Sequence, residues 1–187
     1  MPYSPKLPFA GMQNLNAYDT VMNHQLETVV QAFDPVYGDA ELVYMAMPTS
    51  TALAVGTIVT KVATSLTNVP TPTLGNVTVA NGSVATAMPT GAANTAQAVY
   101  VVINPLTSSA TRQFGWVLKY GQFPVLKTAV TVPSGSRCFI SGTAGRFYVT
   151  ASAGKTLQGM RTANTASVTS TTSTVLCNIT NPMIQGA

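Results

Sequence analysis

The stretch FGWVLKY at residues 114–120 decides the fold class of this chain. Its large side chains recur at every second position: Phe114, Trp116, Leu118 and Tyr120. Successive side chains of a β-strand point to opposite faces, so a period of two places all four on one side. The stretch therefore predicts a strand with one core face and one polar face.

Outward from this stretch, the chain consists of short β-branched runs separated by turn residues. We expect strands over residues 41–47, 57–63, 76–80, 97–104, 112–120, 124–132, 137–141, 146–150, 156–160 and 174–180. Turn signals recur at residues 133–135, 142–145 and 152–154, a spacing typical of sandwiches and barrels. The predicted fold class is mainly β, with a β-sandwich or barrel-like body and one N-terminal amphipathic helix or arm.

Residues 98–103 are apolar at every position. A strand that is buried on both faces loses the alternation of a half-exposed strand. We therefore expect one of two arrangements. Either this is a central strand covered on both sides by its own chain, or its outer face is covered by another subunit.

The first 40 residues differ from the rest because they show a helical period. Their apolar side chains step by three or four: Leu15, Tyr18, Met22, Leu26, Val29 and Phe33. Asp34 precedes a proline, and the residue before proline is disfavoured in helical space. We expect an amphipathic helix of about 18 residues whose apolar face serves assembly. It belongs to an N-terminal arm (residues 1–40), and a β-rich body follows over residues 41–187, with two subdomains split near residue 105 as an alternative.

All five carboxylate side chains and the single histidine lie between Asp19 and Glu41. General acid–base pairs, hydrolytic triads and carboxylate or histidine metal sites need such groups, and residues 42–187 have none. His24 and Glu27 are one helical turn apart, which suits either a metal or a solvated helix pair. We therefore expect that the protein is not an enzyme and has no catalytic residue, metal site or cofactor. We expect it to work by binding.

The low charge of the chain indicates how its surface is used. Charged residues make up 7%, against roughly 25% in an ordinary soluble domain, whereas the hydrophobic content of 46% is close to normal. Residues 62–111 and 162–187 carry no charged side chain. Such a surface has little like-charge repulsion to keep copies apart. The neutral stretches are either polar extended loops or surface that a partner covers.

Charge also divides the chain into two parts of opposite sign. Residues 1–41 hold one lysine and five carboxylates, a net charge of −4, and residues 42–187 hold eight basic side chains and no acidic ones, a net charge of +8. The acidic segment can lie on the basic body of its own chain or of a neighbouring copy, where charge complementarity would orient it. The alternative is that both surfaces stay solvated.

The sequence gives little support to three other kinds of partner. A pI of about 9.2 suggests nucleic acid as a partner, but the basic residues are spread singly along the sequence, without a cluster. Trp116 and Tyr120 could stack on a sugar ring, although their alternation with apolar neighbours favours core packing. The N-terminus resembles neither a signal peptide nor a membrane helix, so no membrane partner is expected.

Cys138 and Cys177 lie in apolar, strand-like runs. They can pair as a disulfide or remain buried thiols. Without an export signal, buried free thiols are the favoured interpretation, because cytosolic chains rarely keep disulfides.

Several glycine-punctuated segments recur in the C-terminal half: FGWVLKYG at residues 114–121, PVL at 124–126, a turn at 134–135, SGTAG at 141–145 and AGKTLQG at 153–159. This rhythm resembles that of small virion proteins of tailed bacteriophages, in particular head decoration (capsid cement) proteins. The resemblance implies a β-rich body, commonly trimeric, that sits outside the capsid at its three-fold positions and locks neighbouring major capsid subunits. The N-terminal segment lies outside the matched rhythm.

On this resemblance we expect a structural virion protein on the capsid exterior, synthesised in the host cytoplasm. Its partners would be the major capsid protein and its own copies in a homotrimer, and nucleic acid is not an expected partner. Two alternatives remain open: another virion component, such as a tail or head-fibre part, and a carbohydrate-binding module.

Overall fold

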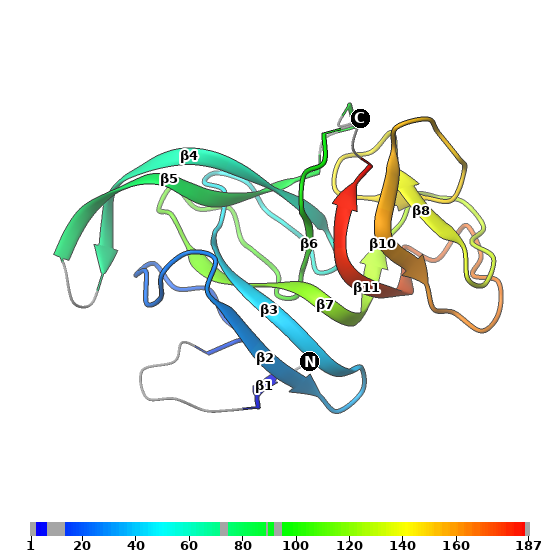
Figure 1. Ribbon diagram of the computed structural model, residues 1–187, viewed down its shortest axis with the longest axis horizontal. Helices are drawn as coiled ribbons and strands as arrows, with labels where there is room; N and C mark the ends of the chain where they lie inside the picture. Colours follow the sequence, from blue (N-terminus) through cyan, green and yellow to red (C-terminus); the bar gives the residue numbers. More distant parts are fainter. Residues whose placement is uncertain (1–2, 7–13, 72–74, 89, 92–94, 186–187) are drawn as a thin grey trace.

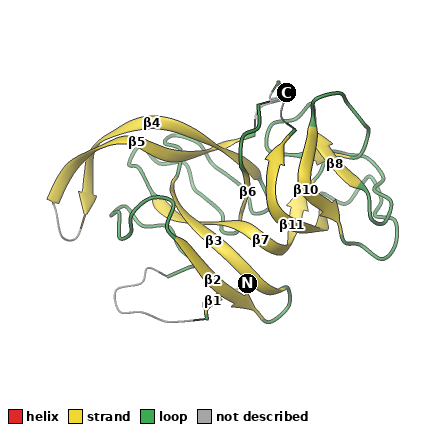
Figure 2. Ribbon diagram, in the orientation of Figure 1, coloured by secondary structure: helices red, strands yellow, loops and turns green. Residues whose placement is uncertain are grey.

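The computed structural model describes residues 3–6, 14–71, 75–88, 90–91 and 95–185, and between residues 62 and 86 it describes only the backbone. Strands, turns and loops make up the whole of this part of the chain, and none of it is helical (Figure 2). The prediction of a mainly β fold is therefore confirmed.

The strands are β1 (Ser4–Pro5), β2 (Val29–Asp34), β3 (Gly38–Ala46), β4 (Ile58–Thr71), β5 (Gly75–Ala87), β6 (Val99–Val102), β7 (Phe114–Leu126), β8 (Arg137–Ile140), β9 (Phe147–Tyr148), β10 (Thr156–Thr162) and β11 (Thr174–Ile184). They form one sheet in the order β1-β2-β3-β5-β4-β6-β7-β11-β10-β8-β9, and β3 also pairs with β7. Its strand pairs are antiparallel except for a short parallel contact between β3 and β5. The hairpin of β4 and β5 projects to one side of the molecule, whereas β8, β10 and β11 lie at the opposite side (Figure 1).

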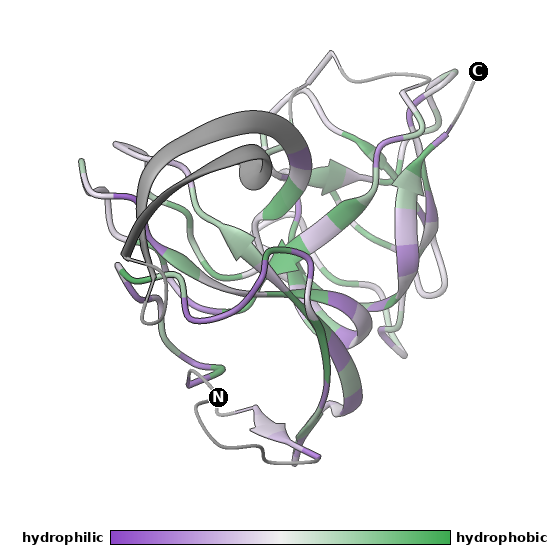
Figure 3. Cartoon of the chain, turned by 60° about the vertical axis from the view of Figure 1, so that its left-hand side comes forward, coloured by the Kyte–Doolittle hydropathy of each residue, from purple (hydrophilic) through white to green (hydrophobic). Residues whose placement is uncertain are grey.

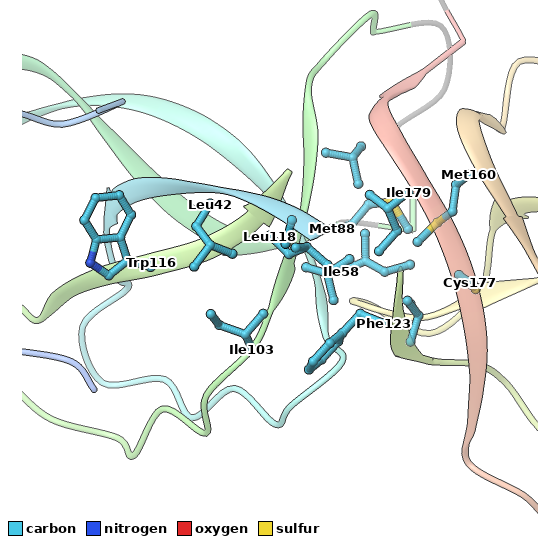
Figure 4. Packing of buried hydrophobic residues seen from close by; sticks show 14 of the residues in the cluster. Leu42, Ile58, Met88, Ile103, Trp116, Leu118, Phe123, Met160, Cys177 and Ile179 are labelled. Atoms are coloured by element: carbon cyan, nitrogen blue, oxygen red, sulfur yellow. The ribbon is translucent and has the colours of Figure 1, made fainter. Parts of the chain in front are cut away.

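Strand β7 holds the sheet together because it pairs with β3, β6 and β11. Leu118 lies opposite Leu42 of β3 and Val101 of β6, and all three side chains are fully buried. Figure 4 shows Leu42 and Leu118 in the core. Two separate strands were expected over residues 112–120 and 124–132, but one strand runs through. Gly121 makes this possible, because it has a φ of 131° and a Cβ there would meet the carbonyl oxygen of Asp39 at 2.9 Å.

The core face predicted for β7 ends before Tyr120. Phe114, Trp116 and Leu118 are fully buried, whereas Tyr120 is 43% exposed. The register explains the difference, since Leu42 lies opposite Leu118 while Glu41 lies opposite Tyr120. This leaves one extra residue on β7, and such a bulge turns the next side chain to the other face. The prediction that Tyr120 shares the core face is therefore wrong.

Two apolar clusters cover opposite faces of the central strands. On β3, Leu42 and Tyr44 belong to the larger cluster, and the intervening Val43 and Met45 belong to the smaller one. On β6, Val101 and Val102 divide in the same way. The apolar run at residues 98–103 is thus a central strand that its own chain covers on both faces, apart from the exposed Ala98 at its start.

The predicted N-terminal helix is wrong. Residues 14–28 form turns, bends and a single bridge between Asp19 and Phe114, and Glu27 has a positive φ of 70°, which a right-handed helix does not allow. Residues 29–34 form strand β2, which buries every second side chain and pairs with β3 along its length. Val29 and Phe33 are four residues apart, a spacing that places two side chains on one face of either a helix or a strand. Hydrogen bonding to β3 selects the strand.

Asp34, which was predicted to end the helix, is instead the last residue of strand β2. Its carboxylate accepts hydrogen bonds from the backbone N–H groups of Val36 at 2.7 Å and Tyr37 at 3.0 Å, which shapes the turn into β3. The expected domain boundary at residue 40 falls inside β3, and the expected split near residue 105 falls between β6 and β7.

Candidate functional site

The six residues predicted to form an assembly face do not share one face. Leu15 is buried in the larger core cluster, against which Met22 and Leu26 also pack. Tyr18 packs against the smaller cluster. Val29 and Phe33 remain at the surface, 48% and 45% exposed. Four of the predicted assembly residues therefore contribute to the interior of this chain.

Tyr18 and Leu15 are fixed by the connection between β6 and β7. The Tyr18 hydroxyl donates to the carbonyl oxygen of Asn104 at 3.0 Å, and the Asn104 amide donates to the carbonyl oxygen of Leu15 at 3.0 Å. The hydrogen bond between Asn104 and Leu15 is buried, and the one between Tyr18 and Asn104 is partly buried. The segment around Leu15 is therefore part of the packed body.

Exposed apolar side chains gather instead on β2 and the turn that follows it. We call this set the β2 rim: Val29, Phe33 and Val36, which are 48%, 45% and 64% exposed. Val29 and Phe33 lie on the same face of β2, separated by the exposed Gln31. Hydrophilic and hydrophobic residues alternate along several of the described strands (Figure 3). Single exposed apolar residues are common, but a group of three on one edge suits contact with a partner.

The β2 rim continues onto β3 and β7. Gln31 lies opposite Glu41, and Glu41 lies opposite Tyr120, so the exposed Gln31 and Tyr120 and the half-buried Glu41 share a face with Phe33. The β7 bulge adds Tyr120 to this surface. Trp116 is fully buried and is not available to stack on a sugar ring, which leaves Tyr120 as the exposed aromatic group on this part of β7.

The hairpin of β4 and β5 extends far beyond the sheet that anchors it (Figure 1). Strand β4 pairs with β6 only over Ile58–Thr60, and β5 meets β3 only at Val84. From residue 64 to residue 82 the two strands pair with each other alone among the described residues. We call the described residues of this part, 64–71 and 75–82, the ribbon, and their sequence contains no charged side chain. A two-stranded ribbon without a third layer is marginally stable in water, which favours a partner surface that covers it.

The carboxylates of the N-terminal segment are engaged within their own chain. Asp39 lies 2.7 Å from the Lys6 amine, Glu41 lies 3.8 Å from the Lys119 amine, and Glu27 pairs with Lys61. Asp34 shapes the β2–β3 turn, and Asp19 accepts from the Asn23 amide at 2.9 Å. The structure thus contains one of the arrangements expected from the charge pattern, in which the acidic segment contacts basic residues of its own chain.

His24 packs against two aromatic rings of the core. Its ring centroid lies 5.2 Å from that of Tyr44 and 5.4 Å from that of Trp116, and partial burial lowers the pKa of His24. Residues 14–28 are not helical, so the expected arrangement of His24 and Glu27 as a helix pair is wrong, and Glu27 forms an ion pair with Lys61. Within the described ranges, no group of three or more His, Cys, Asp or Glu side chains could hold a metal ion.

Three of the basic side chains serve the fold. The buried Lys127 amine donates to the carbonyl oxygens of Thr128 and Val130 at 3.3 Å and 2.9 Å, and burial lowers the pKa of Lys127. Arg146 donates to the carbonyl oxygen of Lys127 at 3.0 Å, and Arg112 donates to that of Met47 at 2.8 Å. These side chains stabilise loops and do not present a free basic surface.

Cys138 and Cys177 are both buried as free thiols. Burial, together with the interaction with the neighbouring Cys138 thiol, raises the pKa of the Cys177 thiol well above its usual value. A thiol of raised pKa holds little thiolate at neutral pH and reacts slowly. The cysteines therefore act as small apolar core residues.

Sequence reasoning missed the β2 rim because it assigned Val29 and Phe33 to a helix. Residues 29–34 read VVQAFD and do not alternate between polar and apolar types, so the β-branched pair Val29 and Val30 is the one local signal that favours a strand. Comparison with known proteins finds no matching family model, no matching curated protein and no matching solved structure. Among the residues that the structure describes, none lies in a helix long and apolar enough to cross a membrane.

Proposed function

We propose that this chain is a structural virion protein that binds the outside of a bacteriophage capsid and cements neighbouring major capsid subunits. The observation that carries the proposal is the ribbon, an uncharged two-stranded extension that projects from a well-packed β body. It supplies a long surface with backbone hydrogen-bonding groups and no side-chain charge to desolvate. The resemblance of the C-terminal half to capsid decoration proteins supports the same role.

The distribution of contact surfaces supports cementing. The ribbon and the β2 rim lie on separate parts of the molecule, so each can contact a different subunit (Figure 1). A protein that holds two subunits at once gains affinity from effective concentration beyond that of either contact. Because the protein binds the assembled lattice and not the separated subunits, its binding raises the free energy needed to separate them. The protein acts by binding and has no catalytic role.

The finer features of the fold belong to the same proposal. The strand pairings lead from β3 through β5, β4, β6 and β7 back to β3, which supports a barrel-like body. The protein acts as a homotrimer on the shell, as the resemblance implies. Its location is the capsid exterior after synthesis in the host cytoplasm.

The experiment that tests the proposal shortens the ribbon. A variant in which residues 66–80 are replaced by a tight Asn-Gly turn keeps the anchored ends of β4 and β5. We expect it to retain its β circular dichroism but to lose binding to capsids from which the protein has been stripped. A matched control deletes residues 170–172 from the exposed Thr/Ser loop before β11. If the shortened variant binds capsids and protects them from heat as well as the full chain does, the ribbon is not the docking element.

Copy number separates this role from that of a tail or fibre component. A cement protein occupies repeated lattice positions, so purified particles should contain it at a fixed high ratio to the major capsid protein. Quantitative mass spectrometry of the particles measures this ratio. A ratio typical of a tail part would contradict the cementing role.

A further inference from the structure

A pocket of about 530 Å³ lies on the far side of the molecule from the ribbon, over β10 and the adjoining parts of β8 and β11. Two arginines, Arg137 and Arg161, lie in its wall. The remaining polar lining includes Gln158, Asn178, Thr180 and Gln185. The pocket lies where the pairing of β10 with β8 is irregular. The two strands pair at Thr156–Phe139 and again at Arg161–Arg137, and the register shifts between these two pairs.

The two arginines lie directly opposite each other across the strand pair. Like charges at such positions destabilise a sheet. Both residues are exposed, and among the described residues neither guanidinium has a hydrogen bond or an ion pair. The arrangement is therefore unfavourable for the isolated chain and becomes favourable when an anion lies between the two guanidiniums.

No Asp or Glu side chain lies among the described residues that line the pocket. Residues 42–187 contain no carboxylate side chain, and the five carboxylates that precede them are engaged with partners on the other part of the sheet. The carboxylate side chains of this chain therefore do not supply the anion, which favours a partner molecule as its source.

The lining of the pocket favours a peptide over a nucleic acid. Side-chain amides such as those of Gln158 and Asn178 both donate and accept, and can pair with a peptide backbone. None of the described residues that line the pocket is aromatic and able to stack a base, and two arginines do not form the extended basic track that phosphate backbones require. An arginine fork matches a carboxylate with two parallel hydrogen bonds.

We propose that this pocket binds an acidic peptide segment of a partner protein, whose Asp or Glu carboxylate is held between Arg137 and Arg161. The site goes beyond the proposed capsid role, because its chemistry is the same whichever protein supplies the acidic segment. Its failure would leave docking by the ribbon and the β2 rim intact.

The test measures binding of a fluorescein-labelled oligoglutamate peptide to the full chain by fluorescence anisotropy at low salt. The variants are Arg137→Gln, Arg161→Gln and Arg161→Lys, all at exposed positions where the fold should persist. We expect each glutamine variant to bind roughly tenfold more weakly, the size of one lost charge-assisted hydrogen bond. Arg161→Lys should also weaken binding, since lysine keeps the charge but lacks the fork.

The control is Lys155→Gln, which removes the same charge from the turn before β10 but lies outside the pocket lining. It should bind the peptide as the unmodified chain does. Three outcomes would overturn the proposal: no binding of the peptide at low salt, equal weakening by Lys155→Gln, or tighter binding of an oligothymidylate of equal charge. The last outcome would assign the pocket to nucleic acid.

Discussion

Tyr44 and Trp116 lie opposite each other on β3 and β7, with ring centroids 5.1 Å apart and both side chains fully buried. The Tyr44 hydroxyl also accepts a hydrogen bond from the backbone N–H of Asn23 at 3.1 Å. This pair therefore joins the centre of the sheet to the irregular N-terminal segment. The segment that was expected to be a separate arm is attached to the most buried part of the core.

The buried hydroxyl of Tyr44 makes stability depend on alkaline pH. Burial raises the pKa of Tyr44 from 10.0 to about 12, whereas the unfolded chain keeps the ordinary value. From about pH 10 to about pH 12 the unfolded state therefore binds fewer protons, so the free energy of unfolding falls as the pH rises. Burial shifts the pKa values of Tyr3, Tyr18, Tyr37 and Tyr100 in the same direction.

Urea titrations at a series of alkaline pH values measure this decline. Tyr44→Phe removes one of the titrating hydroxyls and should make the decline less steep, at a cost of about 1 kcal/mol at neutral pH from the lost hydrogen bond. A variant that declines as steeply as the unmodified chain would show that Tyr44 does not titrate as expected.

Leu15 and Val29 provide a direct test of the N-terminal structure. On a helix both would lie on one apolar face, but the structure buries Leu15 at 2% exposure and leaves Val29 at 48%. Leu15→Ala should lower the free energy of unfolding by about 2–5 kcal/mol. Val29→Ala should change it by no more than about 0.5 kcal/mol. Thermal denaturation followed by circular dichroism measures both values, and equal losses would restore the helical interpretation.

Local sequence patterns suffice to predict burial on some strands of this protein and fail on others. The period of two in β7 predicted the buried Phe114, Trp116 and Leu118, because burial there follows from alternation alone. The reversal at Tyr120 depends on a bulge that is set by register with β3, and no local residue type marks it. The Arg137–Arg161 pair is likewise a product of strand pairing, since the two residues are remote in sequence.

Position 56 requires glycine for two reasons, the positive φ of its backbone and the close approach of the β7 backbone. It has a φ of 82°, and a Cβ there would meet the carbonyl oxygen of Pro124 at 2.7 Å. Gly135 also has a positive φ, of 67°, but a Cβ there would meet nothing within 4 Å. Gly135→Ala should therefore cost about 1–2 kcal/mol from backbone strain alone. Gly56→Ala should cost clearly more, because β7 must also move, and chemical denaturation compares the two. A smaller loss at Gly56 than at Gly135 would contradict this account.

The buried thiols predict a simple pattern of chemical reactivity. Cys138 and Cys177 should both react with a thiol reagent in denaturant, since neither is in a disulfide. In the native protein both should react far more slowly, because they are buried and Cys177 has a raised pKa. Absorbance titration with Ellman's reagent measures both rates. Absence of reactive thiols in denaturant would show that the two cysteines pair.

The last prediction tests the β2 rim as part of the capsid-binding surface. Phe33 is 45% exposed and lies on the same face of β2 as Gln31, which is exposed but polar. If the rim docks on a partner, Phe33→Ser removes an aromatic contact and should weaken binding to stripped capsids by roughly tenfold, while the melting temperature of the free protein stays nearly unchanged. Gln31→Ser shortens a neighbouring side chain on the same strand face and should have little effect on either quantity. Co-sedimentation of each variant with stripped capsids measures the affinity. If both variants bind stripped capsids as tightly as the unmodified chain does, the β2 rim does not take part in docking. The ribbon would then be the remaining candidate contact.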